Sequence, residues 1–131
     1  MTDLVRVLIL DDDPYLRTTL GDVLAAKGFA PIQVSTGEEA LEYARRGEID
    51  IALIDLRLED MPGLDALRSV KEISPAVECI MLTGHASQTS AIQAINLGAY
   101  SYFEKPVDME KLLLSIRRAA EKKDAVQALS E

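Results

Sequence analysis

The chain has 131 residues, of which 48% are hydrophobic and 27% charged, so it fits one folded domain with a sizeable core. Its formal net charge of −8 excludes a protein that holds nucleic acid on a broadly basic surface, because phosphate backbones attract positive side chains. No apolar run reaches the roughly 20 residues of a membrane span, and the N-terminus lacks the basic-then-apolar pattern of a signal peptide. A single cysteine, Cys79, cannot form an internal disulfide, so we expect a cytoplasmic protein.

Two short apolar runs near the N-terminus predict strands. Residues 5–10 are rich in β-branched residues and leucine, and they end in three aspartates. Asp13 can then cap a helix in which Pro14 is the first residue, and Gly28 follows the last apolar position of that helix. The second run, residues 30–34, contains a proline, which is typical of a strand at the edge of a sheet.

The middle of the chain predicts a helix, a strand and another helix. Residues 36–39 match the capping box that begins many helices. Residues 51–55 form an unbroken apolar run that ends in Asp55, a pattern that suits a strand buried on both faces. Apolar residues then recur at helical spacing over residues 64–73, before a serine and a proline end the pattern.

The last third repeats the same alternation. Residues 77–82 predict a fourth strand, and residues 87–97 predict a helix that stops before a glycine. Residues 100–104 predict a short fifth strand. Asp108 can then cap a last helix, whose apolar positions continue to Ala120. The helical pattern weakens after that point.

The order of elements predicts an α/β fold with one sheet. Strand and helix alternate five times, and right-handed crossovers then require a parallel sheet with helices on both faces. We see no internal repeat and no interior linker. Because polarity rises after about Glu121, we expect a domain over residues 1–122 and a helical tail or linker over residues 123–131.

Polar side chains follow four of the predicted strands, at the edge of the sheet where the carboxyl ends of parallel strands meet. Crowded carboxylates resist ionisation unless a cation neutralises them, and Mg²⁺ prefers such oxygen ligands together with a phosphoryl oxygen. A lysine and a hydroxyl would complete a pocket for a phosphoryl group, and the carboxylate of the third strand would be the nucleophile. Helix capping alone explains Asp13. The residues are Asp11, Asp12 and Asp13 after the first strand, Asp55 after the third, Thr83 after the fourth and Lys105 after the fifth.

Together these motifs resemble the receiver domain of two-component response regulators, of the chemotaxis-Y type. The resemblance covers residues from about 4 to 121, and it implies a flavodoxin-like (βα)5 fold with sheet order 2-1-3-4-5. The motifs that carry it are Leu10–Pro14, Ile54–Arg57 with Met61–Gly63, Leu82–Gly84, and Gly98–Tyr100 running to Lys105–Pro106.

The resemblance implies how a phosphoryl group would be held. Asp55 would be the phosphoacceptor, Lys105 would pair with the phosphoryl oxygens, and Thr83 would donate its hydroxyl to one of them. The Lys105–Pro106 peptide bond would be cis, at a tight turn. The phosphoryl donor would be a phosphohistidine on a sensor histidine kinase or a phosphotransfer protein.

The resemblance also implies a bound Mg²⁺ as cofactor. Asp12 would bind the ion directly, and Asp11 would bind it largely through water. The carboxylate of Asp55 and the main-chain carbonyl of Arg57 would supply further ligands. We expect a signalling domain that is phosphorylated and dephosphorylated rather than a turnover enzyme.

Tyr102 falls at the aromatic switch position of the family, although a tyrosine in a strand could equally be a core residue. Its rotation would reshape the face made by the fourth helix, the fifth strand and the fifth helix. The same face is a candidate homodimer surface, and we expect no contact with nucleic acid or membrane through this domain. The resemblance implies no particular kinase, output domain or oligomeric state.

Two large side chains are expected to affect the lifetime of the phosphoryl group. Arg57 stands two positions after the phosphoacceptor, and His85 stands two positions after the threonine. By resemblance, side chains at both positions control the access of water. We therefore predict that Arg57 and His85 cover the phosphoryl group and slow its hydrolysis.

Two alternatives come from other functional classes. A phosphatase of the haloacid-dehalogenase type uses an Asp-x-Asp pattern, which Asp11 and Asp13 nominally satisfy. However, Tyr15 stands where that pattern has threonine or valine, and the sequence offers neither a late acidic pair nor a cap domain. The second alternative is a docking module that has the fold but works without phosphate. Such modules usually lack one of the acidic, threonine or lysine positions, which are all present here.

Overall fold

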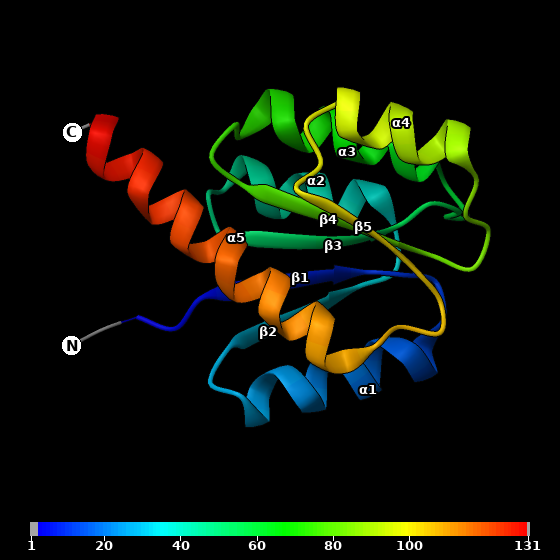
Figure 1. Ribbon diagram of the computed structural model, residues 1–131, viewed down its shortest axis with the longest axis horizontal. Coiled ribbons are helices and arrows are strands. Elements are labelled where there is room, and N and C mark those ends of the chain that lie inside the picture. The colour runs from blue at the N-terminus through cyan, green and yellow to red at the C-terminus, as the bar shows by residue number, and fades with distance from the viewer. Residues whose placement is uncertain (1–2, 131) are drawn as a thin grey trace.

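The computed structural model describes residues 3–130, which form five strands and five helices in strict alternation (Figure 1). This confirms the predicted order of elements. The elements are β1 (Arg6–Leu10), α1 (Pro14–Ala26), β2 (Ala30–Val34), α2 (Gly37–Arg45), β3 (Ile51–Asp55), α3 (Gly63–Ile73), β4 (Glu78–Thr83), α4 (Gln88–Asn96), β5 (Ser101–Glu104) and α5 (Met109–Ser130).

The strands form one parallel sheet in the order β2-β1-β3-β4-β5, as expected. Pro31 lies in the edge strand β2, where a missing N–H is tolerated. Every residue of the central strand β3 is buried, including Asp55 at its end. The flavodoxin-like sheet order is therefore confirmed, together with the position of Asp55 at the carboxyl edge.

Helices lie on both faces of the sheet (Figure 1), and a hydrophobic core fills the space between each face and its helices. Leu8 and Leu10 of β1 face the core shared with α2, α3 and α4. Val7 and Ile9 point the other way, toward α1 and α5. Each of these side chains is almost fully buried, which stabilises the fold by roughly 1.5–3 kcal/mol per residue. The two cores fix the sheet between two layers of helices.

The predicted helix caps at Asp13, Thr36 and Asp108 are present, and Asp108 accepts from the N–H of Lys111 at 3.3 Å. Asp13 accepts hydrogen bonds from the main-chain N–H groups of Tyr15 and Leu16, and Pro14 is the first residue of α1. Thr36 accepts from the N–H of Glu39 at the start of α2. None of the helices between residues 3 and 130 is long and apolar enough to cross a membrane.

Helix α5 extends further than its apolar pattern indicates, because it continues to Ser130 without interruption. Residues 121–130 contain neither glycine nor proline, so nothing in their sequence breaks a helix. Two ion pairs bind this part of the helix to the amino edge of the sheet. The Nζ atom of Lys122 lies 3.4 Å from Glu78 Oε2, and that of Lys123 lies 3.1 Å from Asp50 Oδ1.

Asp50, just before β3, is the centre of a charge network at this edge. Its carboxylate accepts from the N–H of Arg6 at 2.8 Å and from the Arg6 guanidinium at 3.1 Å. Burial by itself would raise the pKa of Asp50. The hydrogen bonds from Arg6 and Lys123 more than offset burial and lower the pKa from 3.8 to about 2. The folded protein therefore favours the ionised form of Asp50.

We expect the ionised Asp50 to stabilise the protein by about 1–2 kcal/mol at neutral pH, after allowance for partial solvent screening. Because its pKa is lower in the folded state, this contribution is present above about pH 4 and is lost between about pH 4 and 2. Urea unfolding of wild type and Asp50→Asn from pH 7 to 2 should show a stability difference that shrinks in this window. Asp22→Asn, at an exposed position of α1, is the control. Parallel curves for wild type and Asp50→Asn would contradict the prediction.

Candidate functional site

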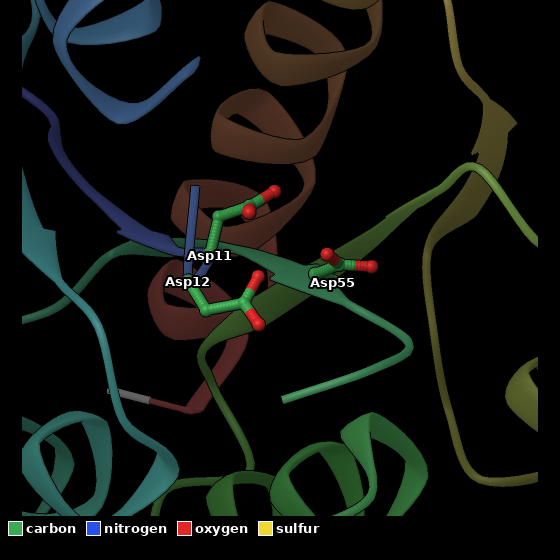
Figure 2. Close-up of side chains that lie close together, drawn as sticks. All are labelled: Asp11, Asp12 and Asp55. Carbon is green, nitrogen blue, oxygen red and sulfur yellow. The ribbon is translucent and has the colours of Figure 1, made fainter. Parts of the chain in front are cut away.

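The predicted site residues meet at the carboxyl edge of the sheet. Asp11 and Asp12 come directly after β1, and Asp55 is the last residue of β3. Figure 2 shows their side chains side by side. One carboxylate oxygen of each lies within 4.8 Å of the other two. Asp11 and Asp55 are buried, whereas Asp12 is exposed, so the cluster is open to solvent on one side.

Lys105 joins this cluster from the segment after β5. Its Nζ atom donates to Asp11 Oδ2 at 2.8 Å and to Asp55 Oδ2 at 3.3 Å. The Lys105–Pro106 peptide bond is cis, as expected. Asp11 also accepts from the N–H of Asp13 at 2.9 Å, while the guanidinium of Arg17 donates to the main-chain carbonyl of Asp11. Hydrogen bonds therefore fix both the side chain and the main chain of Asp11.

The charges in the cluster do not balance. Burial and the nearby Asp11 carboxylate raise the pKa of Asp55, although Lys105 and the N–H of Arg57 oppose this. Burial would lower the pKa of Lys105, but its hydrogen bond to Asp11 and the neighbouring charges raise the pKa overall. The cluster thus contains one ammonium group, that of Lys105, and three carboxylates, of which that of Asp12 is exposed. This donor set fits a divalent cation with oxygen ligands, which would supply the missing positive charge.

Thr83 is fully buried as the last residue of β4, rather than following the strand as the sequence suggests. Its Oγ1 accepts from the N–H of His85 at 2.9 Å. The side chains of His85 and Arg57 are exposed on the two loops that flank the cluster. The main-chain N–H of Arg57 donates to Asp55 Oδ1 at 3.3 Å. The loop after β3 therefore contacts the Asp55 carboxylate through its main chain.

Sequence reasoning missed Ser90, which partners Tyr102. The Tyr102 hydroxyl lies 2.7 Å from Ser90 Oγ, and the half-buried ring packs against the core beneath α4. Ser90 also forms a capping box with Ser87 at the start of α4. The Ser-x-x-Ser spacing is the sequence signal for this cap. On the opposite face of β5, Ser101 Oγ lies 2.7 Å from Ser115 Oγ in α5.

Comparison with known proteins identifies the family. A family model described as Response regulator receiver domain matches residues 7–117. The chain belongs to this family. This confirms the resemblance drawn from the motifs. The acidic cluster of Asp11, Asp12 and Asp55 fits the phosphoacceptor site of a two-component receiver domain.

Curated proteins and solved structures of response regulators are similar to this chain. The transcriptional regulatory protein GlrR of Escherichia coli is 33% identical over 116 residues, which are 88% of this chain and 26% of GlrR. The chain thus spans about a quarter of the length of the curated relatives it matches. A Burkholderia pseudomallei response regulator solved with a phosphorylated aspartate, calcium and citrate is 30% identical, with TM-score 0.81, covering 97% of this chain and 75% of that one. The beryllofluoride-activated NtrC4 receiver domain dimer is 33% identical, with TM-score 0.85, covering 90% of this chain and 98% of that one.

Proposed function

We propose that Asp55 accepts a phosphoryl group from the phosphohistidine of a sensor kinase or phosphotransfer protein, as the receiver domain of a response regulator. An Asp55 carboxylate oxygen attacks phosphorus, the phosphorus–nitrogen bond breaks, and the histidine leaves with its electron pair and takes up a proton. The observation that carries the proposal is the contact of Lys105 with both Asp11 and Asp55 inside an acidic cluster. In this proposal Lys105 would pair with the oxygens of the incoming group.

We propose Mg²⁺ as the cation for this cluster. The residues that would hold it are Asp11, Asp12, Asp55 and the main-chain carbonyl of Arg57, and the bound ion would offset charge on the phosphoryl oxygens. Supporting this are the oxygen-only donor set of the cluster and the calcium named in the Burkholderia structure. The proposal predicts that a chelator prevents phosphorylation.

Thr83 is proposed to donate its hydroxyl to the phosphoryl group. Its oxygen already accepts from the N–H of His85, and a hydroxyl can donate while it accepts. In the structure Tyr102 is held by Ser90. We propose that movement of Thr83 toward the phosphoryl group opens space for Tyr102, which then leaves Ser90 and reshapes the face formed by α4, β5 and α5.

The α4-β5-α5 face is proposed to pair two copies of the chain. Ile92 and Ile95 of α4 and Leu114 of α5 are exposed, and the NtrC4 relative is described as a dimer when activated by beryllofluoride.

We further propose a role in signalling without turnover of a substrate, and a reducing, cytoplasmic location that suits the one buried cysteine. We also propose that the receiver domain ends near residue 122 and that the following residues form a helical tail or linker.

The decisive experiment uses acetyl phosphate labelled with ³²P. We expect one acid-stable, alkali-labile label per chain in wild type with Mg²⁺, and no label in Asp55→Asn or in the presence of EDTA. Steady release of inorganic phosphate without labelled protein would indicate a phosphatase. Equal labelling of wild type and Asp55→Asn would overturn the assignment of Asp55. No labelling under any condition would favour the docking module that works without phosphate.

The same labelled protein tests the proposal that Arg57 and His85 shield the phosphoryl group. Both side chains are exposed on the loops that follow β3 and β4. The double variant Arg57→Ala/His85→Ala should lose its label several-fold faster than wild type. An unchanged lifetime would remove this role.

A further inference from the structure

The loop between β3 and α3 is bound to the N-terminus of α2. Asp60 lies in this loop, and its Oδ1 accepts from the N–H of Gly37 at 2.9 Å, while its Oδ2 accepts from the N–H of Glu38 at 3.1 Å. Both N–H groups belong to the first turn of α2, where a helix leaves its donors unpaired and favours negative charge. The hydrogen bond from Gly37 correspondingly lowers the pKa of Asp60 below its ordinary value.

A second contact fixes the same end of the loop. The side chain of Met61 lies directly over Gly37, because a Cβ atom added at Gly37 would be 2.5 Å from Met61 Sδ and 2.7 Å from Met61 Cγ. Only a glycine leaves room for Met61 in this position. The loop is therefore docked on α2 by one polar and one apolar contact from adjacent residues.

The loop is also closed at its base, close to the phosphoacceptor. The N–H of Gly63 donates to the carbonyl of Leu56 at 2.7 Å, and Arg57 forms an isolated bridge with Pro62. Next to this closure, the N–H of Arg57 donates to Asp55 Oδ1 at 3.3 Å. This distance is long for such a hydrogen bond, so a small displacement of the loop would break it.

We infer that Asp60 is a positioning residue for the Asp55 site. By docking the loop on α2, it sets where the main chain of Arg57 meets the Asp55 carboxylate. Asp60 itself contacts none of the three carboxylates of the cluster in any hydrogen bond that the structure shows between residues 3 and 130. The inference rests on the proposed function, in which the Arg57 main chain helps to hold the cation.

Thr36 provides a matched comparison on the same helix end. Its Oγ1 accepts from the N–H of Glu39 at 3.3 Å, so it also caps α2. However, Thr36 lies in the short connection between β2 and α2, and it does not belong to the loop that carries Arg57. Removing either cap weakens the start of α2, but only removal of the Asp60 carboxylate also removes hydrogen bonds between α2 and the loop that carries Arg57.

The coupling must act in both directions. If Asp60 holds the loop in the geometry that the site requires, a group bound at Asp55 holds the loop against α2. Binding of beryllofluoride with Mg²⁺ should therefore slow hydrogen exchange at the Gly37 and Glu38 amides. The amide of Glu39, which donates to Thr36, should change less.

The experiment compares Asp60→Ala, Asp60→Asn and Thr36→Ala in the same chain. Mg²⁺ affinity is measured by NMR titration without any phosphoryl donor. We expect about a tenfold loss in Asp60→Ala, as for other residues that orient metal ligands, and less than about a twofold change in Thr36→Ala. Asp60→Asn keeps the acceptor for Gly37 but meets the Glu38 N–H with a second donor, so it should give an intermediate affinity.

Equal Mg²⁺ affinities in Asp60→Ala and Thr36→Ala would overturn the inference. So would amide exchange at Gly37 and Glu38 that does not respond to beryllofluoride in wild type, a result that needs no variant to fold. Failure of wild type to take up label from acetyl phosphate would overturn the proposed function instead, because the effect of Asp60 on metal affinity is measured separately.

Discussion

Replacing Lys105 with methionine is expected to slow phosphorylation of Asp55 by on the order of 10²-fold, the usual cost of removing one group that stabilises transition-state charge. Lys105 contacts Asp55 directly and lies beside the oxygens that an incoming phosphoryl group would carry. Mg²⁺ binding should respond in the opposite direction. Removing an ammonium from a cluster of three carboxylates increases its negative charge, so the affinity for the cation should stay the same or rise.

A slower phosphorylation rate together with an unchanged or higher Mg²⁺ affinity distinguishes a role in group transfer from a role in folding. Labelling rates with acetyl phosphate and Mg²⁺ titrations should be measured on the same samples of Lys105→Met. Lys27→Met, at an exposed position after α1, is the control and should match wild type in both. Parallel losses of Mg²⁺ affinity and labelling rate would show that Lys105 supports the cluster as a whole, against the role proposed for it.

Replacing Gly63 with alanine is expected to destabilise the protein by about 2–3 kcal/mol, the upper part of the range of about 1–3 kcal/mol for overpacked sites. A Cβ at Gly63 would lie 2.1 Å from the main-chain oxygen of Asp55 and 2.6 Å from Leu56 Cα. These are main-chain atoms that cannot rotate away, so either α3 or the end of β3 must shift. Since Asp55, the proposed phosphoacceptor, is the last residue of β3, its labelling rate should fall as well.

Gly84→Ala is the matched control, because a Cβ at Gly84 meets nothing within 4 Å. Its unfolding free energy should lie within about 0.5 kcal/mol of wild type. Urea denaturation of the three proteins measures the difference. A Gly63→Ala protein as stable as Gly84→Ala would show that the start of α3 can move away from β3 at little cost.

The fold could be predicted because its signals are local and repeat along the chain. The unbroken apolar run before Asp55 indicates a buried strand, and Pro31 indicates an edge strand. Parallel topology brings the carboxyl ends of the strands to one edge, so the meeting of Asp11, Asp55 and Lys105 follows from the order of elements. Boundaries were less accurate, since Thr83 belongs to β4 and α5 continues to Ser130.

Contacts between loops and helix ends could not be predicted. The hydrogen bonds of Asp60 to α2 depend on the conformation of a loop that no apolar pattern specifies. The pairing of Ser90 with Tyr102 depends on how α4 lies over β5, which packing of the whole core decides. Lys123 meets Asp50 only because α5 extends past the range that its apolar residues indicate.

The edge strand β5 carries one hydroxyl pair on each of its two faces. Tyr102 binds Ser90 on one side, and Ser101 binds Ser115 on the other. Neighbouring residues of a strand point in opposite directions. Rotation of Tyr102 away from Ser90 would therefore leave the hydrogen bond between Ser101 and Ser115 intact. If Tyr102 leaves Ser90 as proposed, a downstream protein that contacts α4 and β5 would distinguish the two states, while the Ser101–Ser115 pair would keep α5 attached to β5 in both.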